Sequence, residues 1–130
     1  MSAQQNAERI RGGYDAFNEA DIATLTELFA EDAVWHSPGR GAVAGDHKGR
    51  DATFAYFGRL HESTDGTFRA NLGSLVAEGD TVIARQTNTA TRGERQLDVN
   101  VCVVFDMRDG RVVEGSEYQY DLYTWDEFWS

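Results

Sequence analysis

The sequence predicts an α+β fold in which a curved, mostly antiparallel sheet wraps over three N-terminal helices. Apolar residues recur every three or four positions in much of residues 3–60, whereas from residue 67 onward they alternate with polar ones. Short turns join the later segments, which favours an antiparallel meander. With 130 residues and no internal repeat or linker, residues 1–130 are expected to form a single domain.

Residues 3–19 have the apolar spacing of an amphipathic helix. The pair Gly12 and Gly13 interrupts it and costs helix stability of roughly 1 kcal/mol per glycine. Because the pair lies beside Tyr14, it leaves room against the helix for a ligand or for Trp125. We therefore expect Tyr14 to face the interior.

Asp21 is expected to cap a second short helix that ends near Ala30. Residues 33–37 are typical of a short strand, which the only proline ends. Residues 38–49 hold four glycines and are expected to form a loop, long enough to be the mouth or lid of a pocket. Residues 51–60 then resume helical spacing.

Four strands are expected in the second half of the chain. They span residues 68–76, 81–91, 97–106 and 111–121. The third has one apolar face, whereas the fourth carries polar groups on both faces. A sheet face that is partly apolar and partly acidic is what a ligand pocket requires.

The formal net charge of −10, from 22 acidic and 12 basic residues, argues against nucleic acid and anionic membranes as partners. The single cysteine, Cys102, excludes an internal disulfide and fits a reducing compartment. No export signal or membrane span is recognisable, so a cytoplasmic location is expected. No histidine pair has metal-ligand spacing and no glycine-rich phosphate loop follows a strand, so we expect neither metal nor cofactor.

Several motifs accompany this order of elements. They are Asn18-Glu19-Ala20-Asp21, Leu28-Phe29-Ala30-Glu31-Asp32-Ala33-Val34-Trp35, Gly49-Arg50-Asp51-Ala52 and Asp109-Gly110-Arg111-Val112. Together they resemble the SnoaL-like branch of the nuclear transport factor two superfamily over essentially the whole chain. The C-terminal segment is similar to that of a bacterial group usually without an assigned reaction.

The resemblance implies a cone-shaped fold with the helices in the concave face of the sheet and a deep apolar pocket open at one end. It also implies a homodimer formed through the outer sheet face. Isomerases, cyclases, hydrolases, dehydratases and plain binding proteins all use this fold, so the fold alone does not assign the activity.

The ketosteroid isomerases of this superfamily use a carboxylate just before the proline of the first strand and a protonated aspartate on a later strand. Here Ser37 precedes Pro38, and Val101 occupies the position that matches the aspartate. The mechanism of those isomerases is therefore disfavoured.

SnoaL-type cyclases use a carboxylate near the end of the sheet, without metal or cofactor. In this chain Asp121 is our candidate for proton transfer, and Glu117 and Gln119 share its parity on the predicted strand. Tyr118 is a further candidate for binding substrate. One alternative is that the carboxylates of Glu117 and Asp121 are solvated charges. Another is that Tyr118 and Tyr120 point inward instead, which would make the pocket phenolic.

Gln86 and Asn88 share parity with apolar residues of their strand, so they are candidates for orienting a carbonyl, although satisfied polar groups near a sheet edge fit equally well. His36 is a second catalytic candidate, because the side chain of histidine takes up and releases a proton near neutral pH. Paired with Asp121, it would form a base with an orienting carboxylate. The sequence does not determine whether His36 or its neighbour Trp35 faces inward. Tyr14, Trp35 and Val101 complete the predicted set of substrate-binding residues.

Our leading hypothesis is therefore a cofactor-independent acid–base enzyme of isomerase, cyclase or hydrolase type. Its expected substrate is a small, apolar metabolite with a carbonyl or an epoxide. The alternative is a protein of the same fold that binds a small ligand without turnover.

Overall fold

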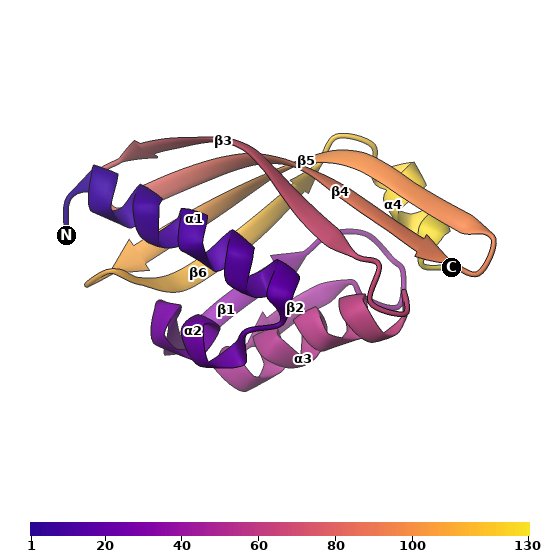
Figure 1. Cartoon of the computed structure of the whole chain (residues 1–130), viewed down its shortest axis with the longest axis horizontal. Helices are drawn as coiled ribbons and strands as arrows, with labels where there is room; N and C mark the ends of the chain where they lie inside the picture. The colour runs from indigo at the N-terminus through magenta and orange to yellow at the C-terminus, as the bar shows by residue number, and fades with distance from the viewer.

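Four helices and one curved six-stranded sheet make up the computed structural model, which describes residues 1–130 (Figure 1). The elements in chain order are α1 (Ala3–Glu19), α2 (Ile22–Leu28), β1 (Phe29–Ser37), β2 (Gly45–Lys48), α3 (Arg50–Glu62), β3 (Arg69–Glu78), β4 (Thr81–Arg92), β5 (Arg95–Arg108), β6 (Arg111–Gln119) and α4 (Leu122–Phe128). The predicted α+β class is confirmed.

The sheet has the strand order β2-β1-β6-β5-β4-β3. All neighbouring strands are antiparallel except β1 and β6, which run parallel. The last three connections are the tight turns expected of a meander. The parallel pair brings the first strand of the chain beside the last one, so residues far apart in sequence meet at the centre of the sheet.

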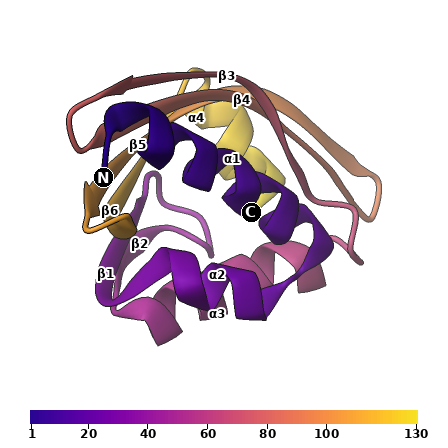
Figure 2. The same cartoon turned by 60° about the vertical axis from the view of Figure 1, so that its left-hand side comes forward.

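The sheet curves around α1, while α2 and α3 close the opposite side (Figure 2). Alternate residues of β4 and β5 face the helices and are buried, as the predicted two-residue period requires. The helix α4 closes one end of the cone, where Trp125, Phe128 and Trp129 pack near Phe68. None of the four helices combines the length and the apolar character that crossing a membrane requires.

A capping box fixes the start of α1: the Ser2 hydroxyl accepts from the backbone N–H of Gln5, and the Gln5 side chain accepts in return from that of Ser2. The two glycines inside this helix have different surroundings. A Cβ on Gly12 would meet nothing within 4 Å, whereas a Cβ on Gly13 would lie 2.5 Å from Leu28 Cδ2. The space beside Gly13 is therefore occupied by α2, and not by Trp125 as considered from the sequence.

The structure differs from the prediction mainly in three segments. The second helix ends at Leu28 and the first strand begins at Phe29, four residues earlier than expected. The segment expected to be all loop contains β2, an edge strand paired only with β1. The last strand ends at Gln119, and α4 follows it. These short elements owe their structure to tertiary packing, which local periodicity does not reveal.

The remaining loop between β1 and β2 is fixed against α4. The carboxylate of Asp126 accepts a hydrogen bond of 3.0 Å from the backbone N–H of Arg40. The preceding Gly39 has φ +97°, and a Cβ there would lie 2.1 Å from Asp126 Oδ1. Only glycine satisfies both the backbone conformation and this close approach.

Candidate functional site

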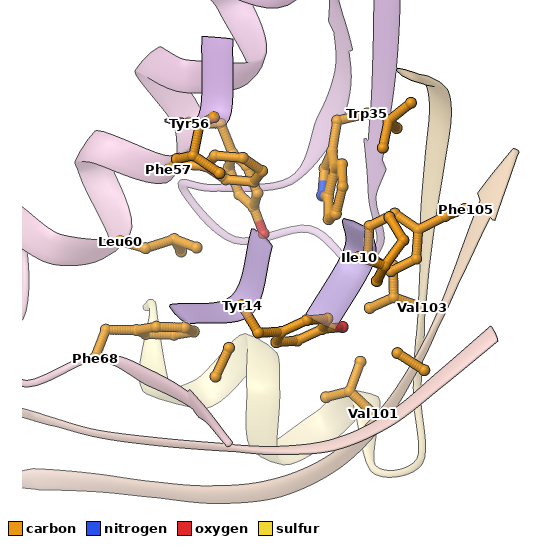
Figure 3. Close-up of a cluster of buried hydrophobic side chains, with 14 of the residues drawn as sticks. Ile10, Tyr14, Trp35, Tyr56, Phe57, Leu60, Phe68, Val101, Val103 and Phe105 are labelled. Carbon is orange, nitrogen blue, oxygen red and sulfur yellow. The ribbon is translucent and has the colours of Figure 1, made fainter. Parts of the chain in front are cut away.

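A largely apolar cavity lies between the concave face of the sheet and the helices α1, α2 and α3. Its empty volume is about 570 Å³, which includes the solvent space at its open side. Fifteen of its 19 lining residues are hydrophobic. The aromatic ones are Tyr14, Phe17, Phe29, Trp35, Tyr56, Phe57, Phe68, Phe105 and Trp125, of which Figure 3 labels six.

One carboxylate, that of Glu117 on β6, belongs to this lining. Its Oε2 accepts two hydrogen bonds, from Trp35 Nε1 at 2.6 Å and from the Tyr56 hydroxyl at 2.5 Å. Its Oε1 accepts a longer one, of 3.2 Å, from Gln119 Nε2. The two oxygens therefore differ: Oε2 is held from two sides, and Oε1 retains more capacity to accept a further proton donor.

Burial raises the pKa of Glu117, because the charged form loses its hydration in this apolar environment. The hydrogen bonds from Tyr56, Trp35 and Gln119 oppose that effect without cancelling it. The pKa of Tyr56 is also raised, chiefly by burial and then by the nearby Glu117 charge, so this phenol remains a protonated donor.

The backbone explains how the two strong donors reach Glu117. Trp35 pairs with Gly115 across the parallel strands, and a Cβ on Gly115 would lie 2.3 Å from the indole ring. The indole therefore lies over bare backbone, two residues from Glu117. Tyr56 comes from α3, where it is fully buried, and its hydroxyl accepts a 3.2 Å hydrogen bond from Ser37.

The ring of His47 stacks on Tyr56 with centroids 4.5 Å apart and an angle of 17° between the planes. His47 belongs to the edge strand β2, so this strand contributes to holding the Tyr56 ring in place. Burial lowers the pKa of His47, which favours its neutral form.

A second polar group lines the cavity on β4. The Tyr14 hydroxyl donates a hydrogen bond to Gln86 Oε1, and Gln86 Nε2 donates one of 2.7 Å to Asn88 Oδ1. All three side chains are buried, and burial is the main cause that raises the pKa of Tyr14. Because β4 lies two strands from β6, the backbone that carries Gln86 and Asn88 lies roughly 10 Å across the sheet from the backbone that carries Glu117.

Five of the residues proposed from the sequence are brought together here. The cavity lining contains Tyr14, Trp35, Gln86, Asn88 and Glu117. Two others lie beside this group without lining the cavity: Val101 is buried on β5, and its register partner Gln119 holds Glu117 Oε1.

Asp121 does not belong to the site, which corrects our first catalytic candidate. The strand ends before it, so the parity that it was expected to share with Glu117 does not extend that far. Asp121 is exposed and caps α4, accepting hydrogen bonds from the backbone and hydroxyl of Thr124. These bonds lower the pKa of its carboxyl group and keep it ionised. Tyr118 is also outside, on the outer sheet face, with 61% of its surface exposed.

His36, the second catalytic candidate, also lies outside the cavity. Trp35 faces inward, so the next residue of β1 faces outward. There His36 bridges two carboxylates, with Nδ1 2.7 Å from Asp46 Oδ1 and Nε2 2.7 Å from Glu114 Oε2. These bonds raise the pKa of His36, and they occupy both ring nitrogens, so His36 does not pair with Asp121.

Tyr56 is the residue of this site that the sequence did not reveal. It lies in the helical run between Phe54 and Phe57, where an aromatic residue is normally a core residue. A phenol buried in a helix needs a hydrogen-bond partner, and that requirement was the available signal. Its partner, however, is 61 positions away on β6.

Comparison with known proteins assigns the family. The family model of the SnoaL-like domain matches residues 10–115. The chain belongs to the SnoaL-like family. The resemblance inferred from its motifs is thereby confirmed.

The similar proteins cover most or all of the chain. An uncharacterized protein of Mycobacterium tuberculosis strain H37Rv is 30% identical over 131 residues, which cover all of both chains. The solved structure of Bal32a, from a soil-derived mobile gene cassette, is 56% identical, with a TM-score of 0.97 over 98% of each chain. IdmH, a proposed polyketide cyclase from Streptomyces antibioticus, is 26% identical, with a TM-score of 0.76 over 89% of this chain and 92% of its own.

Proposed function

We propose that this protein is a cofactor-independent acid–base enzyme of isomerase, cyclase or hydrolase type, acting on a small, apolar carbonyl or epoxide compound. The observation that carries the proposal is the Glu117 carboxylate, enclosed in an apolar cavity and held there by Tyr56 and Trp35. We assign proton transfer to Glu117 in place of Asp121.

The environment of Glu117 suits general acid–base catalysis. Burial raises the pKa of this carboxyl group, which moves it towards the range in which a group both accepts and releases protons near neutrality. Tyr56 and Trp35 fix Oε2, so the orientation of the carboxylate is set before a ligand enters. The less engaged Oε1 is the oxygen that would take a proton from the substrate.

Tyr14, Gln86 and Asn88 form the group that we expect to orient the substrate. Their hydrogen-bonded chain is buried and faces the same cavity, so a carbonyl oxygen near it would find polar partners in an otherwise apolar wall. The similarity to IdmH supports a reaction on a carbonyl-bearing compound, since that relative is a proposed polyketide cyclase.

Proton transfer can be tested before the natural substrate is identified. The probe is the exchange of α-protons of small aryl ketones with D₂O, followed by proton NMR. Wild-type protein should accelerate exchange over buffer. Glu117→Gln should abolish the acceleration and leave the dissociation constant of the ketone within about tenfold, because only the proton-transfer step is lost.

Asp121→Asn is the matched control, since it also removes one negative charge and asparagine caps helices as well as aspartate does. It should exchange as fast as wild type. If Glu117→Gln exchanges as fast as wild type, the role of Glu117 is wrong. If ketones bind but no exchange occurs with wild type, the protein is a binding protein without this chemistry.

A further inference from the structure

We propose that the cavity binds a ligand carrying a protonated amine, and that the ammonium group binds beside Glu117. This inference rests on the proposed function and adds a protonated amine to the carbonyl or epoxide compound that the function assigns. Three independent features of the molecule support it: the charge of the lining, the aromatic walls and the net charge of the whole chain.

The lining contains one acidic side chain, Glu117, and no lysine, arginine or histidine. The donors that hold this carboxylate, Tyr56, Trp35 and Gln119, are all neutral. They satisfy its hydrogen-bonding capacity in part and supply no opposite charge to its ionised form. A carboxylate enclosed in apolar surroundings is stabilised most by a cation, which a ligand would have to bring.

Nine of the 19 lining residues are aromatic. The faces of such rings carry negative potential and attract organic cations, which is how cages of aromatic residues bind quaternary ammonium groups. The donors Trp35 and Tyr56 are themselves part of this wall. Figure 3 shows the Trp35 indole nitrogen and the Tyr56 hydroxyl turned towards the same region. Both donate to Glu117, so the two rings lie next to the carboxylate.

The net charge of −10 acts in the same direction, because an acidic protein draws cations towards its surface before they bind. A neutral or anionic ligand gains nothing from this field.

The two oxygens of Glu117 define the position of the ammonium group. Oε2 already accepts from two donors, while Oε1 accepts one hydrogen bond of 3.2 Å and remains open to an N–H donor. Along that bond the ammonium N–H can break as an O–H forms at Oε1, leaving a neutral amine and a neutral carboxylic acid. An amine ligand is therefore consistent with acid–base chemistry at Glu117.

The experiment compares three probes of nearly equal shape. N,N-dimethylbenzylamine is a cation near neutral pH, isobutylbenzene is its uncharged carbon isostere, and isobutyrophenone is a neutral ketone. Dissociation constants are measured by isothermal titration. The indole N–H signals in proton–nitrogen NMR spectra report binding in the cavity, because two of the three tryptophans, Trp35 and Trp125, line it.

We expect wild-type protein to bind the amine at least about tenfold more tightly than either neutral probe. Glu117→Gln should remove that preference and leave binding of isobutylbenzene within about twofold, since only the charge is deleted. Glu94→Gln, at the exposed turn between β4 and β5, changes the net charge equally and should keep the preference.

The probe comparison on wild-type protein needs no variant, so it decides the question even if Glu117→Gln folds poorly. Neutral probes that bind as tightly as the amine would overturn the amine inference and leave the small-molecule site intact. Amine binding that Glu117→Gln does not weaken would also overturn it. If none of the probes shifts the indole signals, the proposed function fails together with the inference.

Discussion

Tyr56 donates a hydrogen bond of 2.5 Å to Glu117 and thereby joins α3 to β6 inside the cavity. The phenol is fully buried and also accepts from Ser37, so neither its position nor its donor role depends on solvent. Of the three hydrogen bonds that favour the ionised form of Glu117, the one from Tyr56 contributes most, so Tyr56 is the main residue that positions the proposed acid–base group.

We predict that Tyr56→Phe raises the pKa of Glu117 further. A hydrogen bond to a charged group contributes about 1.5–3 kcal/mol, and 1.36 kcal/mol corresponds to one pKa unit, so the expected rise is about one unit or more. The measurement is a carbon-13 NMR titration of the glutamate side-chain carboxyl signals. Tyr118→Phe, on the outer sheet face, is the control. An unchanged Glu117 titration in Tyr56→Phe would contradict the positioning role.

We predict that Glu117→Gln is at least as stable as wild type at pH 8, with a gain of up to about 2 kcal/mol. A carboxyl group whose pKa is raised on folding binds its proton more tightly in the folded state. Wild-type stability therefore falls as pH rises through that pKa, whereas the amide does not titrate. The free energy of unfolding is measured with urea, and the excess of the variant over wild type should increase from pH 4 to pH 8. A variant that is less stable than wild type by more than about 1 kcal/mol at pH 8 would contradict this prediction.

The adjacent glycines of α1 should respond in opposite ways to alanine. Gly12→Ala should stabilise the protein by about 0.5–1 kcal/mol, because helix propensity improves and the new methyl group meets nothing within 4 Å. Gly13→Ala should destabilise it by about 1–3 kcal/mol, because its methyl group overlaps the buried Leu28 side chain. Thermal unfolding of both variants is the measurement, and shifts in the same direction would show that this packing is wrong.

His36 should make stability depend on pH near neutrality. The carboxylates of Asp46 and Glu114 raise the pKa of His36. The stabilisation is fully present below the unfolded-state pKa of about 6.5 and is lost as pH rises through the folded value. The stability difference between wild type and His36→Gln should thus be larger at pH 6 than at pH 9. A difference that is equal at both pH values would show that the bridge does not stabilise the fold.

The outer sheet face is where we predict a homodimer. Val76, Ile83 and Val104 are register partners on three neighbouring strands and form an apolar row on this face, with Val76 and Ile83 exposed. Ile83→Asp should shift wild-type dimer to monomer in sedimentation velocity, because it places a charge within the apolar row. The control is Glu94→Gln, outside this row. Monomeric wild-type protein at about 100 µM would refute the prediction.

Periodicity predicted most of the fold, because helix and strand patterns are local properties of the sequence. It also placed Gln86 and Asn88 on the sheet face that lines the cavity, since they alternate with buried residues such as Val82 and Ala84. The short elements β2 and α4 were missed, because segments of four and seven residues contain too few repeats to show a period.

The choice of carboxylate could not be made from the sequence. Glu117 and Asp121 have the same parity, and only the end of the strand at Gln119 separates a half-buried position in the cavity wall from a helix cap. Likewise, periodicity separates Trp35 from His36 but does not say which one faces the helices. The indole fits over Gly115 on a neighbouring strand, a contact that no local pattern contains.

The parallel pairing of β1 with β6 has a consequence for folding. Trp35 and Glu117 lie 82 positions apart in the chain, and their hydrogen bond closes a loop that contains the intervening helix and hairpins. Closing so long a loop is slow, because its entropy must be lost before the contact is gained. Until then the carboxylate remains in water, where its charge costs nothing. The proposed acid–base group is thus enclosed only where β1 and β6 pair, and a chain that stops short of this topology does not form the cavity.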